Sequence, residues 1–594
     1  MQPIRHPRTS RPATPSPVRA ATVRERRAPI ELGSTLRNIR GYTRLALLLI
    51  VQCCSAVQLT PPAAGPYHVS GNRIIDAAGH PYLARGTELP TLTLDPSDLA
   101  GDGHQFGPFS PSSLVSIRQR LNMNAVRLPL DAQSFVEHPA YRERAVEVVR
   151  SANHFELLVI LAAANSDVPE RFWPLCAETF KTFPDVFFAP AADGQSLTSG
   201  IRAKGAAQPI LLTFAGLTPE LQVHDANVIY SATPRYATLR TAEDRRAQFG
   251  ELSDRAPVLV NDLDPRLDED SAECAAFPHD PGAATQLLRD HLAYFDAHQI
   301  SWILSSYRPG RMLTEYRYFN WSKLDDGWTC GESPSHGGIA MVLAAHLWGV
   351  DPHGLFPVNH VNGGLVLARG GIATAYGPIL ADREVTAPAG APLPLRLANI
   401  SIRVTDSQGI ARRAALQYTG AGWSNITFIV PQAAARGPAE IAVVRTDGSV
   451  SAAKVILADI APGFFSASAD ARGVAVGDVT QRDSVAGQTR TFAISECSGY
   501  DCRAMPIALS PKVRTTLRLA GSGFRNAGSG AKVHVTVGGI AVPVISFGAK
   551  DNVGRDQVTI ELPSSLGTLG ETDLAMTVNG RLSNVVRIHC TGTQ

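Results

Sequence analysis

The sequence predicts an α/β fold: a (β/α)8 TIM barrel followed by two immunoglobulin-like β-sandwich domains. Three observations support this prediction. Eight short apolar runs alternate with amphipathic segments between residues 67 and 350, as expected for parallel strands covered by helices. After Asp351 long helical patterns stop, and Val, Ile, Thr, Gly and Pro dominate. Alternating runs joined by turn residues there are typical of β-sandwiches.

The predicted barrel strands are apolar almost throughout, because both faces of a strand in a parallel sheet are covered. They are residues 81–86, 124–130, 157–163, 185–191, 209–214, 227–232, 257–262 and 301–307. Segments between them, such as 141–155 and 282–298, repeat apolar residues at the helical spacing of three and four. A doubly wound open sheet is the alternative, but no glycine-rich phosphate loop follows the first strand. We expect the barrel to cover residues 65–350.

The C-terminal part is predicted to form one β-sandwich at 355–465 and a second at 466–592. Asp447–Gly448 separates two alternating runs, which indicates a hairpin, and Gly538–Gly539 does the same further on. Cys497 and Cys502 are close enough in sequence to close a small loop in the second sandwich.

The N-terminus has the features of an exported protein. Residues 1–35 are rich in Arg, Pro and Ser and are expected to be disordered, and 36–57 resemble a signal peptide. Its apolar core, Leu45 to Val51, is too short to cross a bilayer as a helix. Lipidation at Cys53 or Cys54 is an alternative fate of this segment. We therefore expect a secreted or cell-surface bacterial protein with no transmembrane segment in the mature chain.

The net charge and the cysteine content indicate which ligands and which cellular compartment to expect. A net charge of +2 gives no electrostatic argument for binding nucleic acid. Six cysteines follow the signal peptide, an even number that suits an oxidising compartment, and none has zinc-site spacing. No metal or cofactor is expected. Cys274 and Cys330 lie in neighbouring loops after the last two barrel strands and are predicted to pair, whereas Cys176 and Cys590 have no evident partner.

Chemistry in TIM-barrel enzymes occurs where the strands end, at the C-terminal face. The polar residues predicted at that face are Arg127, Asp193, Thr233, Asp262 and Ser305, with Tyr236 nearby. Asp193 and Asp262 end the fourth and seventh strands. Retaining glycosidases use two carboxyl groups about 5–5.5 Å apart, and an arginine beside one keeps it ionised. Arg127 is the candidate for that cation.

Simpler interpretations remain open for each of these residues. Asp193 before Gly194 suits a turn or helix cap, and Asp262 would then merely open a loop. Arg127 would serve instead as a structural ion-pair residue. Three tryptophans are expected in the core and two in a polar loop where they would stack on a ligand; the core set is Trp173, Trp302 and Trp348, and the loop set is Trp321 and Trp328.

About 280 residues resemble glycoside hydrolase family 5, the cellulase family of clan A. The resemblance is carried by "GNRIIDAAGHPYLARG" (71–86), "IRQRLNMNAVRLPL" (117–130), "VIYSATPRY" (228–236) and "ISWILSSYRPG" (300–310). It implies retaining hydrolysis of O-glycosyl bonds in a β-linked polysaccharide. Asp193 would then be the acid/base, Asp262 the nucleophile and Arg127 the orienting cation.

The chain departs from the family at the catalytic motifs. The family has Asn-Glu-Pro after strand four and a nucleophilic Glu after strand seven; here Ala192-Asp193-Gly194 and Asp262 occupy these places. The family's two histidines fall at Thr233 and near Ala163, and its sugar-stacking tryptophan falls at Ser305. Arg127 matches the family, and Tyr236 is assigned as matching. These changes predict weak or altered hydrolysis, or, as the alternative, an inactive carbohydrate-binding or scaffold protein with a relic barrel.

The C-terminal part resembles an acidobacterial-type C-terminal domain of secreted proteins. The similar stretches are "VNGGLVLARGGIATAYG" (361–377), "ITFIVP" (426–431), "DIAPGFF" (459–465) and "VGRDQVTIELPSSL" (553–566). By analogy with immunoglobulin-like modules, this resemblance implies attachment, display or binding at the cell exterior.

Overall fold

The structure, a computed structural model, describes most of the chain from residue 59 onward. The described ranges are 59–93, 107–190, 194–213, 225–234, 238–263, 281–305, 338–349, 355–378, 380–421, 423–467, 473–483, 487–498 and 501–592. The predicted N-terminal extension, signal peptide and Cys53/Cys54 lie outside these ranges. Among the described helices, none combines the length and the apolar character needed to span a bilayer.

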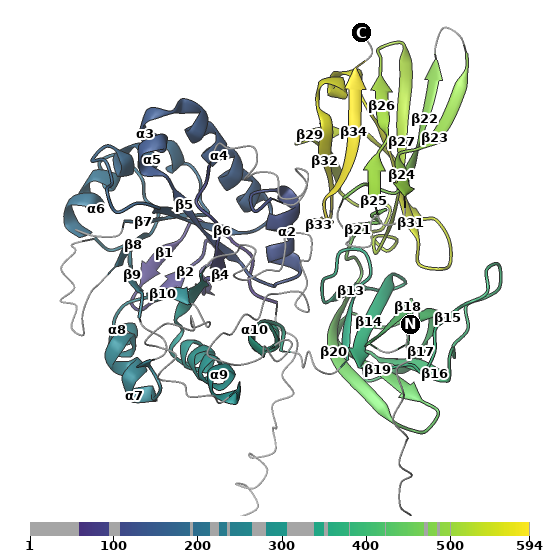
Figure 1. Cartoon of the computed structure of the whole chain (residues 1–594), viewed down its shortest axis with the longest axis horizontal. Coiled ribbons are helices and arrows are strands. Elements are labelled where there is room, and N and C mark those ends of the chain that lie inside the picture. Colours follow the sequence, from purple (N-terminus) through teal and green to yellow (C-terminus); the bar gives the residue numbers. More distant parts are fainter. Residues whose placement is uncertain are drawn as a thin grey trace, which may run out of the picture. The chain divides into compact units, whose positions relative to one another are not determined.

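Eight parallel strands close into a barrel, which confirms the predicted architecture and excludes the open doubly wound sheet. Around the barrel the order is β10-β11-β4-β5-β6-β7-β8-β9, so strands that follow each other in the sequence pair, and β11 closes the barrel by pairing with β4. Figure 1 labels the other barrel strands. The strands are β4 (Arg85–Glu88), β5 (Ala125–Leu130), β6 (Leu158–Ala163), β7 (Val186–Ala189), β8 (Ile210–Thr213), β9 (Val228–Ala232), β10 (Val258–Leu263) and β11 (Ser301–Leu304).

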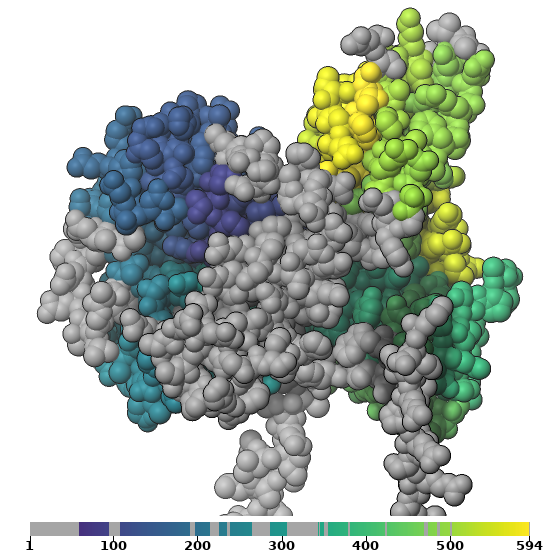
Figure 2. All heavy atoms as spheres, in the orientation of Figure 1, coloured from purple at the N-terminus to yellow at the C-terminus, as the bar shows by residue number. Residues whose placement is uncertain are grey.

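Helices surround the barrel and form its outer surface, seen as blue to teal atoms in Figure 2. They are α2 (Pro111–Gln119), α3 (Ala132–Glu137), α4 (Pro139–His154), α5 (Phe172–Phe180), α6 (Gly194–Arg202), α7 (Ala242–Arg245), the π-helix η2 (Arg246–Gly250), α8 (Glu251–Ser253), α9 (Pro281–His298) and α10 (Gly338–Trp348). Ser110 caps α2 by accepting a hydrogen bond from the Ser113 N–H, and Pro111 follows at the first helical position.

Side chains alternate along each barrel strand between the interior and the helices. On β5, Ala125 joins the interior cluster, whereas Val126 and Leu128 pack in the outer cluster with the helices. Gly86 of β4 marks a very close approach: a Cβ at this position would lie 2.0 Å from the Ala125 carbonyl oxygen. The first two strands can therefore pair this closely only with glycine at position 86.

A small antiparallel sheet precedes the barrel and contributes to its interior cluster. It contains β1 (His68–Ser70), β2 (Arg73–Ile75) and β3 (Pro81–Tyr82). The ring of Tyr67, just before β1, packs edge-on against Phe187 of β7 with centroids 5.3 Å apart. The predicted first strand, 81–86, was wrong in its bounds, because that apolar run belongs partly to β3 and only partly to β4. Hydrophobicity continues across both elements and does not show where one ends.

Residues 355–458 form a nine-stranded sheet over its own hydrophobic cluster. The predicted hairpin at Asp447–Gly448 is confirmed by antiparallel pairing of the strands on either side. The strands are β12 (Phe356–Asn359), β13 (Val366–Ala368), β14 (Ile372–Pro378), β15 (Val385–Thr386), β16 (Ile400–Thr405), β17 (Ala411–Thr419), β18 (Trp423–Ile429), β19 (Gly437–Arg445) and β20 (Val450–Ala458).

The last part of the chain has two six-stranded sheets that enclose one hydrophobic cluster. The first contains β21 (Gly463–Phe464), β22 (Gly477–Asp483), β23 (Thr489–Ala493), β27 (Val513–Ser522), β30 (Val544–Ala549) and β31 (Asp556–Glu561). The second contains β26 (Pro506–Leu509), β28 (Val533–Val537), β29 (Ile540–Val542), β32 (Gly570–Val578), β33 (Arg581–Leu582) and β34 (Val586–Gly592). The short 3-10 helix η5 (Ser564–Thr568) follows β31, and the predicted hairpin at Gly538–Gly539 joins β28 to β29.

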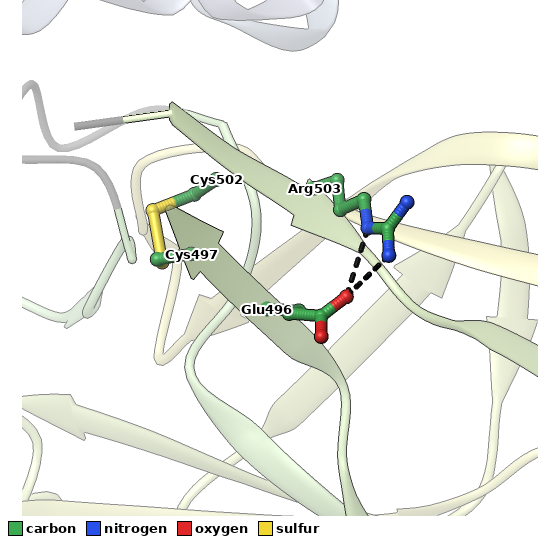
Figure 3. Close-up of a disulfide and its surroundings, with 4 residues drawn as sticks. All are labelled: Glu496, Cys497, Cys502 and Arg503. Atoms are coloured by element: carbon green, nitrogen blue, oxygen red, sulfur yellow. Dashed lines mark hydrogen bonds and ion pairs between the residues drawn. A yellow bond between two sulfur atoms is a disulfide. The ribbon is translucent and has the colours of Figure 1, made fainter. Parts of the chain in front are cut away.

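A separate hairpin, β24 (Ser495–Ser498) with β25 (Asp501–Ala504), carries the predicted disulfide. Cys497 and Cys502 face each other across the two strands, and their sulfur atoms are bonded (Figure 3). Beside them the Arg503 guanidinium donates to the Glu496 carboxylate, with Nε 2.9 Å from Oε2. The disulfide and this pair close a short, largely exposed hairpin.

Candidate active site

Two neighbouring strands place charged side chains inside the C-terminal mouth of the barrel. Glu88, the last residue of β4, and Arg127 of β5 are partners in the parallel ladder. Arg127 lies on the same face of β5 as the interior residue Ala125 because side chains alternate along a strand. The Arg127 guanidinium donates to the Glu88 carboxylate. Their side chains are 25% and 23% exposed, so the pair is accessible from the mouth yet largely screened from water.

Arg127 was predicted at the C-terminal face of the barrel, but it does not end its strand. β5 continues for three residues to Leu130, because Pro129 and Leu130 still pair with β6. Pro129 lacks an N–H but its carbonyl accepts from the Leu92 N–H at 3.0 Å. Arg127 is consequently set deeper in the barrel than a residue at the strand end would be.

Asp262 sits in a β-bulge at the end of β10. Val260 pairs with Trp302, but Leu263 pairs with Leu304, so Asn261 and Asp262 together oppose the single residue Ile303. Asp262 takes a left-handed backbone conformation with φ 55°, which aspartate tolerates better than most residues. Its side chain is exposed. A bulge of this kind redirects a side chain, here the predicted nucleophile, away from the regular alternation.

The charge of Asp262 acts on Arg127. Burial lowers the pKa of Arg127, and the negative charge of Asp262 opposes that shift by stabilising the protonated guanidinium. The Arg127 Nε–H is buried and faces no acceptor within the part of the chain that the structure describes. The guanidinium thus has one nitrogen on Glu88 and a buried Nε–H without an acceptor among the described residues.

Of the other described residues at or directly after the strand ends, Asp131 follows β5 and caps α3, and the rest are uncharged. Thr233 follows β9 and is exposed, and Ser305 follows β11. The Ser305 N–H donates to the Leu263 carbonyl at 3.2 Å, which ties the last strand to the bulge. Below them the Asn261 amide donates to the Ser231 hydroxyl. Besides the helix-capping Asp131, the charged side chains at the described strand ends are therefore Glu88, Arg127 and Asp262.

Several predicted site residues lie outside the described residues: Asp193, Tyr236, Trp321, Trp328, Cys274 and Cys330. The predicted carboxylate pair, ligand-stacking tryptophans and mouth disulfide stay predictions. Trp173, Trp302 and Trp348 are buried, as expected for core residues. Cys176 and Cys590 are buried free thiols. Within the described residues no group of three or more His, Cys, Asp or Glu side chains could hold a metal ion.

Glu88 is the residue that the sequence prediction missed. The first barrel strand was expected to end at Gly86, which left Glu88 in a loop, whereas β4 runs from Arg85 to Glu88. The sequence contains a signal that could have revealed Glu88. This acidic residue comes directly after "RGT", two positions after Gly86. A carboxylate at that spacing lies on the same face as Gly86, toward the barrel interior.

Comparison with known proteins gives structural likenesses only. No protein-family model matches the chain. No curated protein matches it either. A beta-glucanase from Saccharophagus degradans in complex with cellotetraose is 16% identical, with a TM-score of 0.37 over 50% of this chain and 98% of that one. A beta-glycosidase from Bacteroides vulgatus is 9% identical, with a TM-score of 0.32 over 89% of this chain and 66% of that one.

A third similar structure is a mixed-linkage glucan utilization protein from Bacteroides ovatus in complex with a mixed-linkage heptasaccharide. It is 10% identical, with a TM-score of 0.18 over 38% of this chain and 43% of that one. All three TM-scores lie below 0.5. The barrel assignment therefore rests on the strand pairing itself.

Proposed function

We propose that the barrel hydrolyses O-glycosyl bonds in a β-linked polysaccharide with retention of configuration, with Asp262 as the nucleophile. The observation that carries this proposal is the exposed aspartate near the end of the seventh barrel strand, whose negative charge raises the pKa of Arg127. A nearby guanidinium keeps a carboxylate ionised and fixes its orientation, which a nucleophile requires. The family 5 resemblance of the sequence assigns the same roles to the same two residues.

In the proposed reaction an Asp262 oxygen attacks the anomeric carbon of the sugar. The bond between that carbon and the leaving oxygen breaks, its electron pair goes to the leaving oxygen, and a general acid supplies the proton. Water then attacks the anomeric carbon, releases Asp262 and returns a proton to the general acid. Asp193 is the proposed general acid, from its place after the fourth strand in the sequence.

The β-bulge in β10 affects the position of the Asp262 carboxylate, which stands where the resembled family has a glutamate. An aspartate carboxyl group lies one methylene, about 1.5 Å, closer to the backbone than that of glutamate, and a displacement of about 1 Å can cost roughly 10²-fold in rate. The extra residue in β10 and the positive φ of Asp262 give this carboxylate a backbone position that a regular strand does not offer. This supports aspartate as a working nucleophile.

Carbohydrate binding without catalysis is the second candidate function. It is favoured by the Glu88–Arg127 ion pair, because a guanidinium already neutralised by one carboxylate stabilises a second one less. The small side chains at Ala163, Thr233 and Ser305, where the family carries two histidines and a tryptophan, favour it too. Such a barrel would bind an oligosaccharide and leave it intact.

The proposal also covers the cellular location of the protein and the role of its C-terminal region. We infer that the protein is exported to the cell surface or secreted and that its C-terminal sheets form two immunoglobulin-like sandwiches that display or attach it. The Cys497–Cys502 disulfide supports an oxidising compartment, where such bonds persist. The two sheets around one core in the last part of the chain support the sandwich architecture.

Two measurements on the purified full chain test the proposal. Reducing-sugar release from β-glucans, mannans and xylans should be detectable in the wild type and lost in Asp262→Asn, but kept in Asp447→Asn, which changes an exposed turn residue. Calorimetric titration with the matching oligosaccharides should give binding in all three proteins. Binding without turnover in the wild type would contradict hydrolysis and support the second candidate. Neither binding nor turnover on any glycan would contradict both.

A further inference from the structure

The barrel and the C-terminal sheets, which span residues 355–592, belong to one compact unit of the chain, Ser55–Gln594. We propose that the C-terminal sheets stabilise the closed barrel: they bind the C-terminal end of α2, which in turn holds α10. This role does not rest on the proposed function, because it concerns the stability of the barrel in the protein without ligand.

One hydrophobic cluster contains residues of both parts. Most of its members come from the outer face of the barrel strands and from the helices around them. Four buried members come from the C-terminal sheets and the turns between their strands: Val358, Leu365, Ala575 and Val585. Each of these side chains is at most 9% exposed, so they cover apolar surface of the barrel. Removing that surface from water stabilises the two parts when they are together.

The C-terminal end of α2 makes polar contacts with the C-terminal sheets. The side-chain amide of Gln119, the last residue of α2, donates to the Leu582 carbonyl on β33 at 2.9 Å. The Nε–H of Arg120, the cap residue of α2, donates to the Asn362 carbonyl, also at 2.9 Å. Both acceptors are main-chain oxygens, so these two hydrogen bonds tie the end of α2 to the backbone at two separate places in the C-terminal sheets.

The turn between β12 and β13, which carries Asn362, allows a close approach of Arg120. Gly363 in this turn has φ 73°, a left-handed conformation that favours glycine. A Cβ at position 363 would lie 2.7 Å from Nε of Arg120, closer than a Cβ normally approaches another heavy atom. Glycine at this position therefore serves both the conformation of the turn and its contact with the barrel.

The same end of α2 also holds α10, the helix that follows the last barrel strand. The indole N–H of Trp348 donates to the Arg120 carbonyl at 3.2 Å. The Asn122 side-chain amide donates to the Leu347 carbonyl at 2.6 Å. α2 connects β4 to β5, whereas α10 follows β11, and β11 closes the barrel by pairing with β4. Arg120 therefore connects the C-terminal sheets to helices from both ends of the barrel.

Two independent modules that only touch are the competing explanation. The C-terminal sheets have two hydrophobic clusters of their own, as modules that fold separately do. In that case, weakening the contact at Arg120 would leave hydrogen exchange in the barrel unchanged. If the sheets stabilise the closed barrel, a weaker contact must increase local opening of α2, α10, β4 and β11, and their amides must exchange faster.

The test is hydrogen exchange measured by mass spectrometry on the purified full chain without ligand. In Gly363→Ala the added methyl group displaces Arg120, so exchange in α2, α10, β4 and β11 should become at least about fivefold faster. Gly409→Ala is the matched control, because its φ of 75° gives the same backbone strain but a Cβ there meets no atom within 4 Å. It should make exchange faster only around its own turn, between β16 and β17.

Val585→Ala is the second variant, should Gly363→Ala fail to fold. It removes two methyl groups from the shared hydrophobic cluster on the side of the C-terminal sheets, and it should make exchange faster in the same four barrel elements. Wild-type exchange in the barrel of either folded variant would overturn the proposal, and so would equal effects of Gly363→Ala and Gly409→Ala on the barrel. Because no glycan is present, the outcome is independent of whether the barrel hydrolyses or binds carbohydrate.

Discussion

Glu88 and Arg127 pair through their backbones in the ladder between β4 and β5 and through their side chains in an ion pair at the barrel mouth. An arginine in this position serves a nucleophile in the family that the sequence resembles, but here a carboxylate from the adjacent strand already engages it. Asp262 adds a second carboxylate from the bulge in β10.

Replacing Arg127 with methionine should damage the site more than the fold. The variant keeps an unbranched side chain but leaves two carboxylates without their shared cation. We expect kcat/KM on the best glycan substrate to fall by about 10²-fold, the size of effect seen when a preorganised electrostatic partner is removed. Arg514→Met, which breaks an exposed ion pair with Glu561 (2.9 Å), is the control. Equal kinetics in the two variants would contradict the assigned role.

Gly86→Ala should disrupt the pairing of the first two barrel strands. The added Cβ would lie 2.0 Å from the Ala125 carbonyl oxygen, and neither strand can move without opening the barrel. We expect the free energy of unfolding of the barrel to fall by about 1–3 kcal/mol or more. Chemical denaturation followed by tryptophan fluorescence measures this change. Gly530→Ala, where a Cβ meets no atom within 4 Å, should behave as the wild type.

His346 should make the protein sensitive to acid. Burial lowers the pKa of this imidazole to about 4, with Asp296 opposing the shift and Arg85 adding to it. The unfolded chain, with the ordinary value of 6.5, binds the proton more readily, so protonation favours unfolding. This contribution to stability is complete above pH 6.5 and is lost as the pH falls toward 4. The loss should be on the order of 2–3 kcal/mol.

Denaturation of wild type and His346→Gln across pH 4 to 7 checks this expectation. His346 Nδ1 lies 3.7 Å from an oxygen of Asp296, whose other oxygen accepts from Arg85 at 2.6 Å, so the cluster joins α10, α9 and β4. The glutamine variant cannot take up the proton and should show a flatter pH dependence. Parallel curves for the two proteins would mean that His346 does not titrate in this range.

Removing the Cys497–Cys502 disulfide should have a local effect. The bond closes a loop with a sequence separation of five residues, for which the chain-entropy model gives a contribution of about 2 kcal/mol. The double variant Cys497→Ser/Cys502→Ser should therefore lower the stability of the last β-region by no more than this. Hydrogen exchange should show faster exchange in β24 and β25 and no change in the barrel. Faster exchange throughout the barrel strands would contradict a local role.

The pattern of hydrophobic residues predicted the architecture well, because it shows which side chains are buried. Strand–helix alternation gave the barrel, and turn residues such as Asp447–Gly448 and Gly538–Gly539 gave hairpins that the strand pairing confirms. Where burial does not change at an element boundary, the pattern failed. The apolar run at 81–86 crosses from β3 into β4 without a break, which misplaced the end of the first barrel strand.

The site was harder to predict because it depends on register. Asp262 was predicted as a site residue from its place at a strand end, but its bulge and positive φ arise from pairing with β11, which no local pattern encodes. Arg127 was identified, yet its partner Glu88 was missed because the misplaced strand end put that carboxylate in a loop. A contact between adjacent strands needs both registers, and an error of two residues in one was enough to lose it.

Covalent trapping of the nucleophile tests the central claim most directly. The purified full chain is incubated with activated 2-deoxy-2-fluoro β-glycosides, whose fluorine slows release of the glycosyl-enzyme intermediate, and the adduct is located by peptide mass spectrometry. We expect a mass increase of one glycosyl unit on the peptide that contains Asp262, absent in Asp262→Asn and present in Asp447→Asn. A label on a different residue, or no label in a wild-type protein that binds the glycan, would contradict Asp262 as the nucleophile.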